Sequence, residues 1–239
     1  MSLVWSLLFK DPAIILSTIF MGSLSVACSF FDSQGNKQHA ISQAWARMLL
    51  RIGGVTVRIR GIENVDPAQN YLFAGNHRSL YDTPVVLGSI PQQFLFLVNQ
   101  RYVRLPFLGT HLRRAGHFSV DSNDIRSSLK IMTEAAKRIQ ERKLSVVLFP
   151  EGSRARDGVQ QFKEGAAYIA IKAQVPVIPF ALRGTREVLP IGSVHVRGLP
   201  VDFIIGKPIS TSGMTLKDRQ RLTSEMRNRV ADLLEAAGS

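Results

Sequence analysis

The chain has 239 residues, of which 45% are hydrophobic and 20% charged, a composition that excludes global disorder and allows one large domain or two small ones. Lys and Arg number 30 against 18 Asp and Glu, and the formal net charge of +12 favours an anionic partner such as nucleic acid, acidic lipid or a phosphorylated substrate. The single cysteine, Cys28, excludes an internal disulfide and a cysteine-based zinc cluster. We therefore expect no structural metal.

A long uncharged segment lies near the N-terminus. Pro12–Phe31 contains no charged side chain, and as a helix it would be about 30 Å long, close to the thickness of the bilayer hydrocarbon. We interpret it as a membrane-attachment segment, with a secretory signal peptide and a buried core helix as alternatives. A signal peptide is disfavoured because the apolar run Leu3–Phe9 precedes the first lysine, and no clear small-residue cleavage site follows.

The following segment has a helical pattern with two readings. Arg47 and Arg51 fall on the side of the helix opposite its apolar residues, which are Ile41, Trp45, Met48, Leu49 and Ile52. Such a helix can lie at the lipid interface, or it can pack on the protein core, and periodicity alone does not decide. We predict an N-terminal helical membrane-association segment over residues 1–52 and one α/β domain over residues 53–239.

Beyond residue 54, short apolar runs alternate with amphipathic stretches. The pattern predicts strands at 55–60, 71–74, 94–98, 117–120, 144–149, 177–182 and 202–205. It predicts helices at 80–87, 122–140 and 163–173, and a last helix that opens at Thr215 with Asp218 in a near capping box. Alternating strands and helices predict a layered α/β domain.

The first segment with chemical content runs from Asn76 to Asp82, directly after a predicted strand. A carboxylate five residues after a histidine can fold back onto the imidazole, so Asp82 can fix the tautomer of His77 and leave its other nitrogen free to accept a proton. The alternative is a helix N-terminus, with Ser79 as the cap and Asp82 completing a capping box. Both interpretations can hold together.

The second such segment, Phe149–Arg154, follows another predicted strand. Gly152 lets the backbone approach a ligand closely, and Arg154 can bind a phosphate through two parallel hydrogen bonds. The alternative is a surface turn with a weak pair between Glu151 and an arginine. Ser153 does not lie in a Gly-x-Ser-x-Gly elbow, so a serine hydrolase is poorly supported.

A basic stretch between residues 101 and 117 contains no acidic residue. It can attract phosphate, or it can be a solvated helix face, and its arginines are Arg101, Arg104, Arg113 and Arg114. The histidines outside the first motif are isolated or lack a partner carboxylate motif, and we expect no metal ligation from them: His39, His111, His117 and His195. Nucleic-acid binding is disfavoured because no reader motif is present.

Taken in order, these segments resemble the glycerolipid acyltransferase family, most closely the bacterial 1-acyl-glycerol-3-phosphate acyltransferases. His77 to Asp82 is similar to the family's His-x4-Asp block, and Phe149–Arg154 is similar to its Phe-Pro-Glu-Gly-[Thr/Ser]-Arg block. Three further segments fit the family's spacing, namely 61–64, 162–166 and 175–180. The resemblance covers residues 55–208 and implies a mixed, largely parallel sheet flanked by helices.

The resemblance also implies a reaction. An acyl chain would pass from acyl-CoA or acyl-carrier protein to the free hydroxyl of a lysophospholipid, with 1-acyl-glycerol-3-phosphate as the leading acceptor and phosphatidic acid as the product. His77 would be the general base and Asp82 would orient it. The block Glu151, Gly152, Ser153 and Arg154 would bind the acceptor, with Arg154 on its phosphate. A groove walled by residues 175–180 would suit the acyl chain.

No cofactor beyond the thioester co-substrate is expected. The partners would be a phospholipid membrane surface, the lysolipid and the acyl donor. The protein would be membrane-associated, with its active site facing the cytoplasm.

Two positions depart from the family pattern. Where the family usually has a lysine and an arginine, this chain has Asn99 and Ser122, and Arg101 or Arg104 could supply the missing charge. A lysolipid with another headgroup therefore remains an alternative acceptor. A non-enzymatic protein that binds acidic lipid and a thioesterase or lipid hydrolase that uses water are the alternatives from other classes.

Overall fold

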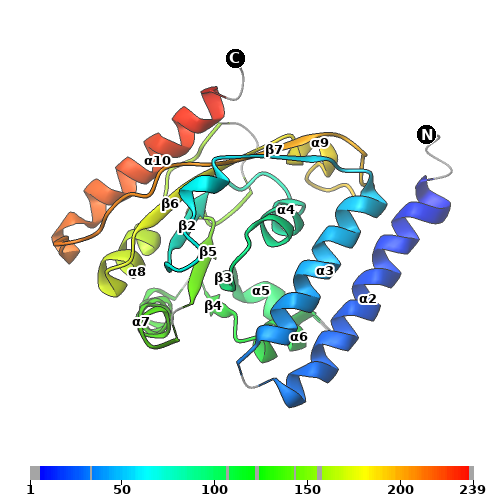
Figure 1. The fold of residues 1–239 in the computed structure, drawn as a ribbon, viewed down its shortest axis with the longest axis horizontal. Coiled ribbons are helices and arrows are strands. Elements are labelled where there is room, and N and C mark those ends of the chain that lie inside the picture. The colour runs from blue at the N-terminus through cyan, green and yellow to red at the C-terminus, as the bar shows by residue number, and fades with distance from the viewer. Residues whose placement is uncertain are drawn as a thin grey trace.

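The computed structural model describes residues 6–32, 34–105, 108–121, 124–142, 144–154 and 158–236. Within these residues, seven strands form one sheet in the order β1-β7-β6-β2-β5-β3-β4 (Figure 1). Their bounds are β1 (Val57–Arg60), β2 (Leu72–Gly75), β3 (Phe94–Asn99), β4 (Phe118–Val120), β5 (Ser145–Leu148), β6 (Val177–Arg183) and β7 (Val201–Ile205). All seven predicted strands are present. Described neighbours pair in parallel except β6 and β7, which confirms the predicted mixed, largely parallel sheet.

The central strands are buried on both faces, as parallel strands covered by helices must be. Alternate residues of β2 enter different cores: Leu72 and Ala74 face one cluster, while Phe73 faces the other. The first cluster includes apolar residues of α7 (Ile125–Arg142), α8 (Gly165–Ala173) and α10 (Arg219–Ala236). The second includes residues of α3 (Asn36–Gly53) and α4 (Asp82–Ser89), so helices cover both faces of the sheet.

The predicted helices correspond to these elements with small shifts at their ends. The predicted start of α7 at Ser122 lies outside the described residues. The last helix begins with the 3₁₀ turn η4 (Leu216–Asp218), where Thr215 and Asp218 form the predicted capping box. Several short helices were not predicted, because one or two turns carry too little periodicity: η3 (Ile62–Asn64), α5 (Gln100–Val103), α6 (Leu108–Arg114) and α9 (Thr185–Val188).

The N-terminal part forms a helical hairpin, which lies at one side of the domain in Figure 1. The π-helical turn η1 (Ser6–Lys10) leads into α2 (Asp11–Cys28), the short 3₁₀ turn η2 (Ser29–Phe31) follows, and α3 returns alongside α2. Trp45 of α3 donates a hydrogen bond to Thr18 of α2 at 3.1 Å, and Leu50 is buried in the core beside α4. The amphipathic segment is therefore a helix that packs on the protein core, as one of its two interpretations predicts.

The first helix exposes most of its apolar side chains. Ser6–Phe31 is long and apolar enough to cross a membrane, and almost none of it is buried, which contradicts the buried core helix. Its large exposed apolar residues are Leu7, Leu8, Phe9, Ile15, Leu16, Ile19, Phe20, Leu24, Phe30 and Phe31. A continuous apolar surface of this kind is typical of a contact with lipid or with another protein, and it favours membrane association.

The sheet topology brings the two chemical motifs to one place. The carboxyl ends of parallel strands meet at the same edge of a sheet, which is where α/β proteins bind ligands. His77 follows β2, Glu151 follows the neighbouring β5, and Arg101 follows β3 on the other side of β5. All three residues thus lie at one edge.

Candidate active site

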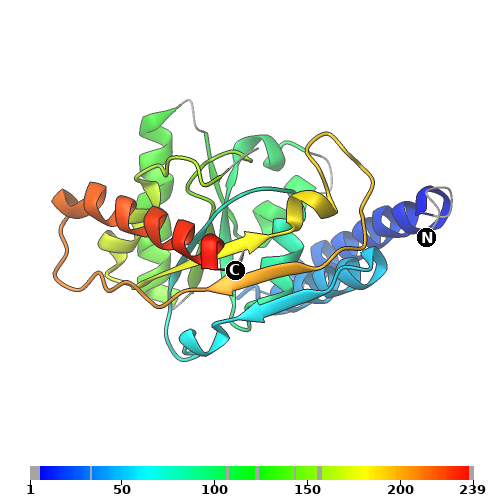
Figure 2. The same cartoon turned by 90° about the horizontal axis from the view of Figure 1, so that it is seen from above.

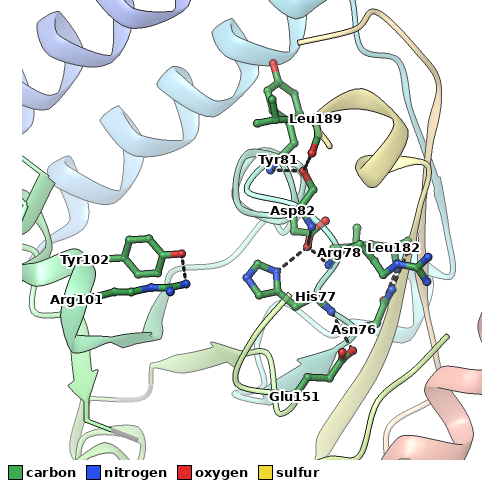
Figure 3. A network of polar contacts seen from close by, with 11 residues as sticks. Asn76, His77, Arg78, Tyr81, Asp82, Arg101, Tyr102, Glu151, Leu182 and Leu189 are labelled. Atoms are coloured by element: carbon green, nitrogen blue, oxygen red, sulfur yellow. Dashed lines mark hydrogen bonds and ion pairs between the residues drawn. The ribbon is translucent and has the colours of Figure 1, made fainter. Parts of the chain in front are cut away.

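His77 and Asp82 are in direct contact. Nδ1 of His77 donates a hydrogen bond to Oδ2 of Asp82 at 2.7 Å, so the contact that their spacing predicts is present (Figure 3). The Asp82 side chain is fully buried and that of His77 is 15% exposed. With its proton on Nδ1, the imidazole has Nε2 as the nitrogen that can accept a proton from a ligand.

Asp82 also organises the turn that carries His77. The same Oδ2 accepts hydrogen bonds from the backbone amides of Arg78 at 2.7 Å and Ser79 at 2.9 Å. The hydroxyl of Ser79 accepts from the amide of Tyr81, at the start of α4. The amides that Asp82 satisfies lie before α4, whose N-cap residue is Tyr81 and has no side-chain capping bond. Of the predicted capping box only the bond from the Ser79 amide to Asp82 is present, so the predicted cap at Ser79 is wrong.

The second motif packs directly against the first. The ring of Phe149 stacks on the imidazole of His77 with centroids 4.3 Å apart and planes 14° apart. Oε1 of Glu151 accepts a hydrogen bond from the backbone amide of His77 at 3.1 Å. The ring is thus fixed by a carboxylate at Nδ1, an aromatic face and an anchored backbone.

Glu151 is buried, and its binding to the acceptor stays a prediction. Burial raises the pKa of this carboxyl, although the hydrogen bond from the His77 amide and the charge of that residue oppose the rise. The acid faces the loop of His77 (Figure 3), so its visible role is to join the two motifs.

The turn after Glu151 exposes the remaining residues of the motif. Gly152 has φ of +74°, and a Cβ at this position would lie 3.0 Å from Nζ of Lys163. The Lys163 side chain therefore lies against this turn, and Arg154, two residues after Gly152, is half-buried. Ser153 is exposed. Lys163 belongs to the segment 162–166, to which the sequence analysis gave no chemical role.

Of the two arginines expected to replace the missing lysine, Arg101 approaches the site. Its side chain and that of Tyr102 extend toward the His77 side in Figure 3, joined by a hydrogen bond of 2.9 Å. Asn99, the departure from the family pattern, caps α5 by accepting from the amide of Arg101. Arg104 is exposed and contacts Gln100 of its own turn at 3.5 Å. The other departure, Ser122, lies outside the described residues.

A family model described as Acyltransferase matches residues 56–183, more than half of the chain, and spans both motifs. The chain belongs to the acyltransferase family. It is 29% identical over 170 residues to a 1-acyl-sn-glycerol-3-phosphate acyltransferase of Limnanthes douglasii, covering 71% of this chain and 60% of that protein. It is 32% identical over 206 residues to the chloroplastic 1-acyl-sn-glycerol-3-phosphate acyltransferase BAT2 of Brassica napus, covering 84% and 58%. The chain thus spans about 60% of the length of these relatives.

A solved structure shares the fold of this acyltransferase-family chain. The crystal structure of the 1-acyl-sn-glycerophosphate acyltransferase of Thermotoga maritima matches it with a TM-score of 0.78, over 98% of this chain and 97% of that one. The identity is 23%, so the likeness establishes the architecture, including the N-terminal helices that the coverage takes in.

The predicted acyl-chain groove is wrong. Residues 175–180 contribute the start of β6, a central strand in which Val177, Ile178 and Phe180 have no exposed surface, so they cannot wall an open groove. An apolar cavity of about 290 Å³ lies elsewhere, between the N-terminal hairpin and the β3 side of the domain. Its lining includes Ile19, Trp45, Thr83, Leu87 and Leu112, and Thr83 directly follows Asp82.

Three histidines line the same cavity. Burial, with the neighbouring His111 and His39 as smaller causes, lowers the pKa of His117 to about 3, and burial lowers the pKa of His39 to about 4. Nδ1 of His117 accepts a hydrogen bond from the amide of Phe96 at 3.0 Å, which requires the neutral ring. These three histidines are partly buried in the cavity wall, and sequence spacing alone gave no signal of their proximity.

Proposed function

We propose that this protein transfers an acyl chain from a thioester to the free hydroxyl of a lysophospholipid, with 1-acyl-glycerol-3-phosphate as the leading acceptor. The single observation that carries the proposal is the contact of His77 with Asp82 at the edge where the Phe149–Arg154 turn also lies. Membership of the acyltransferase family and the names of its relatives support it. The activity, acceptor and donor are proposals because the chain spans only part of those relatives.

His77 is the general base of the proposed reaction. Nε2 accepts the proton of the lysolipid hydroxyl as its oxygen bonds to the thioester carbonyl carbon, and the carbon–sulfur bond then breaks. The proton passes from Nε2 to the departing thiolate, which leaves a diacyl lipid and a free thiol. A positioned base contributes about 10²–10⁴-fold in rate, so positioning of the two substrates supplies much of the remainder.

The acceptor phosphate binds among the basic side chains of the loops that follow β5 and β3. Arg154 and Lys163 lie at the turn beside Gly152, and Arg101 approaches from the α5 side. Guanidinium groups bind phosphate through two parallel hydrogen bonds, and a lysine adds a point charge. Because Arg101 occupies the region of the absent family lysine, a phosphate monoester remains the best-matched headgroup.

The acyl chain enters the apolar cavity between the hairpin and the domain. The cavity wall reaches Thr83, the residue after Asp82, and is formed mainly by apolar side chains. Most binding sites for lipid-like ligands have apolar linings with few polar groups. The exposed apolar side chains of α2 would hold the site at the lipid surface, with the active site open to the cytoplasm from which a soluble donor arrives.

The test is acyl transfer from a thioester to a panel of lysolipids, read by mass analysis of the lipid products. Oleoyl-CoA and oleoyl-acyl-carrier protein serve as donors, and the acceptors differ only in their headgroups. We expect a diacyl product that depends on the acceptor and is greatest with 1-acyl-glycerol-3-phosphate. Release of free fatty acid without any diacyl lipid would assign the site to a thioesterase, and the absence of any thioester consumption would favour a lipid-binding protein.

A further inference from the structure

A second cavity lies beside the first motif and is not used by the chemistry described above. It has a volume of about 610 Å³ and lies at the carboxyl end of β6, between α9 and the end of α10. Figure 2 shows the C-terminal end of α10 beside β6, with α9 close by. Three arginines line the cavity: Arg78, Arg183 and Arg186.

The backbone brings these arginines together from separate parts of the chain. Arg78 follows His77, and its guanidinium donates a hydrogen bond to the carbonyl of Gly158 at 3.5 Å. Arg183 ends β6 and Arg186 lies in α9, on either side of Gly184. Gly184 has φ of +90°, and a Cβ here would lie 2.6 Å from the carbonyl oxygen of Pro200, so the sharp turn requires glycine.

Arg78, which lines the second cavity, follows His77 directly in the chain. In Figure 3, Arg101 and the side chain of Arg78 extend on opposite sides of the imidazole. The proposed reaction has two phosphate-bearing substrates, and both must reach Nε2 of His77 at once. Two separated basic regions flanking one base meet this requirement.

The remaining lining of the second cavity suits a nucleotide. Leu199, Pro200 and Leu234 provide an apolar surface against which a planar base can pack. Glu187 and Glu235 also line it, and a carboxylate accepts hydrogen bonds from ribose hydroxyls and from an amino group. Among the described residues, the lining has three arginines and two glutamates.

We propose that this cavity binds the nucleotide end of an acyl-CoA donor, with Arg183 and Arg186 on its phosphates and Arg78 beside the arm that leads to His77. The inference rests on the proposed function and deepens it, because it selects CoA over carrier protein as the donor for which the chain has a built site. Arginines would also bind the phosphate of a lysolipid headgroup or that of a protein-bound phosphopantetheine arm. The experiment therefore distinguishes these two phosphates from the phosphates of CoA.

The kinetic arm uses the full-length protein with three variable substrates. Arg183→Ala and Arg186→Ala are each compared with Arg142→Ala, which removes an exposed arginine at the far end of α7. We expect each cavity variant to raise KM for oleoyl-CoA about tenfold, as loss of a charge-assisted hydrogen bond to phosphate would. We expect unchanged kcat, unchanged KM for oleoyl-phosphopantetheine, which lacks the nucleotide, and unchanged KM for the lysolipid.

Other patterns of change would overturn the assignment. A rise in KM for the lysolipid alone would give the cavity to the acceptor headgroup. An equal rise for oleoyl-CoA and oleoyl-phosphopantetheine would place only the pantetheine phosphate there. An unchanged KM for oleoyl-CoA in both variants would remove the donor from the cavity altogether.

A binding arm keeps the inference separate from the activity. Adenosine 3′,5′-bisphosphate is titrated into the wild-type protein and the three variants by calorimetry, with thermal unfolding as the folding control. We expect saturable binding that weakens about tenfold in Arg183→Ala and Arg186→Ala but not in Arg142→Ala. If the protein binds this nucleotide but transfers no acyl chain, the nucleotide site is supported and the proposed reaction is refuted. No binding by the wild type, despite acyl transfer, would refute the nucleotide site alone.

Discussion

The backbone amide of His77 donates a hydrogen bond to the side chain of Glu151 at 3.1 Å, although 74 positions separate the two residues. The bond joins the loops that follow the adjacent strands β2 and β5. It therefore fixes the position of the imidazole relative to the turn that carries Gly152 and Arg154. The two motifs form one site because an acid of the second motif holds the backbone of the first.

Glu151→Ala should lower kcat much more than Glu151→Gln. Alanine leaves the His77 amide without its acceptor, whereas glutamine retains an oxygen at the same distance. An unsatisfied buried amide costs about 1–3 kcal/mol, so a rate loss of about tenfold to a hundredfold is expected for alanine. The measurement is kcat with saturating donor and acceptor. Equal loss in both variants would mean that the negative charge of Glu151, and not its acceptor oxygen, is what the site needs.

The stability of Glu151→Gln relative to the wild type should depend on pH in one direction. Because burial raises the pKa of the Glu151 carboxyl in the folded state, the folded protein binds this proton more tightly than the unfolded chain. The contribution of this group to stability is therefore greatest at low pH and is lost as the pH rises through the folded pKa. The free energy of unfolding of Glu151→Gln, minus that of the wild type, should therefore be larger at pH 8 than at pH 4. Urea unfolding of both proteins at the two pH values measures this difference.

Much of the fold was predictable because strands buried on both faces are recognisable as short apolar runs. The strand β6 is such a run, and its fully buried side chains explain both the correct strand assignment and the wrong groove assignment. Apolarity identifies a buried segment, but it does not distinguish a core strand from the wall of a ligand groove. The apolar cavity is built instead by side chains such as Trp45 and Leu112, whose proximity depends on how α3 and α6 pack.

The site was predictable where its contacts are local and not where they are long-range. His77 and Asp82 are five residues apart, so their contact follows from the geometry of one turn. The stacking of Phe149 on His77 and the hydrogen bonds between Asn76 and Leu182, at 2.7 and 2.9 Å, depend on the strand order. No spacing in the sequence specifies that order.

Asp82→Asn should lower kcat by about 10²–10⁴-fold with a small effect on KM for either substrate. The amide cannot fix the proton of the imidazole on Nδ1 as a carboxylate does, so the base is presented less often in the required tautomer. Steady-state kinetics test this, with Asp66→Asn as the control at an exposed turn. A large rise in KM with unchanged kcat would give Asp82 a binding role in place of the orienting one.

The free energy of unfolding should fall as the pH falls from 7 to 5. Burial lowers the pKa values of His117 and His39 to about 3 and 4, so between these values and 6.5 the unfolded chain binds protons that the folded protein does not. The slope that each such histidine contributes grows as the pH falls and reaches about 1.4 kcal/mol per pH unit near pH 5. Urea unfolding at several pH values measures it.

His117→Asn should reduce the slope of the free energy of unfolding against pH by about the contribution of one histidine. Asparagine retains an acceptor for the amide of Phe96 but has no proton to bind in this range. The slope is compared between the variant and the wild type under identical solution conditions. An identical slope would show that His117 is not held neutral by the fold.

The exposed face of α2 should carry the membrane affinity. Leu16→Ser and Phe20→Ser remove side chains that are 65% and 66% exposed, and burial of such a side chain in lipid is worth about 1.5–3 kcal/mol. Each variant should therefore bind vesicles that contain acidic lipid about tenfold or more weakly, as measured by sedimentation. Leu216→Ser, at an exposed leucine beside α10, is the matched control. Equal weakening by all three substitutions would mean that α2 is not the lipid contact.

The most direct test of the account is acyl transfer by His77→Ala, measured as diacyl lipid formed from oleoyl-CoA and 1-acyl-glycerol-3-phosphate. Vesicle binding and thermal unfolding of the same variant establish that the hairpin and the fold are intact. If His77 is the general base, turnover falls by about 10²–10⁴-fold while both controls match the wild type. Turnover within a few-fold of the wild type would contradict the assignment of His77 as the base.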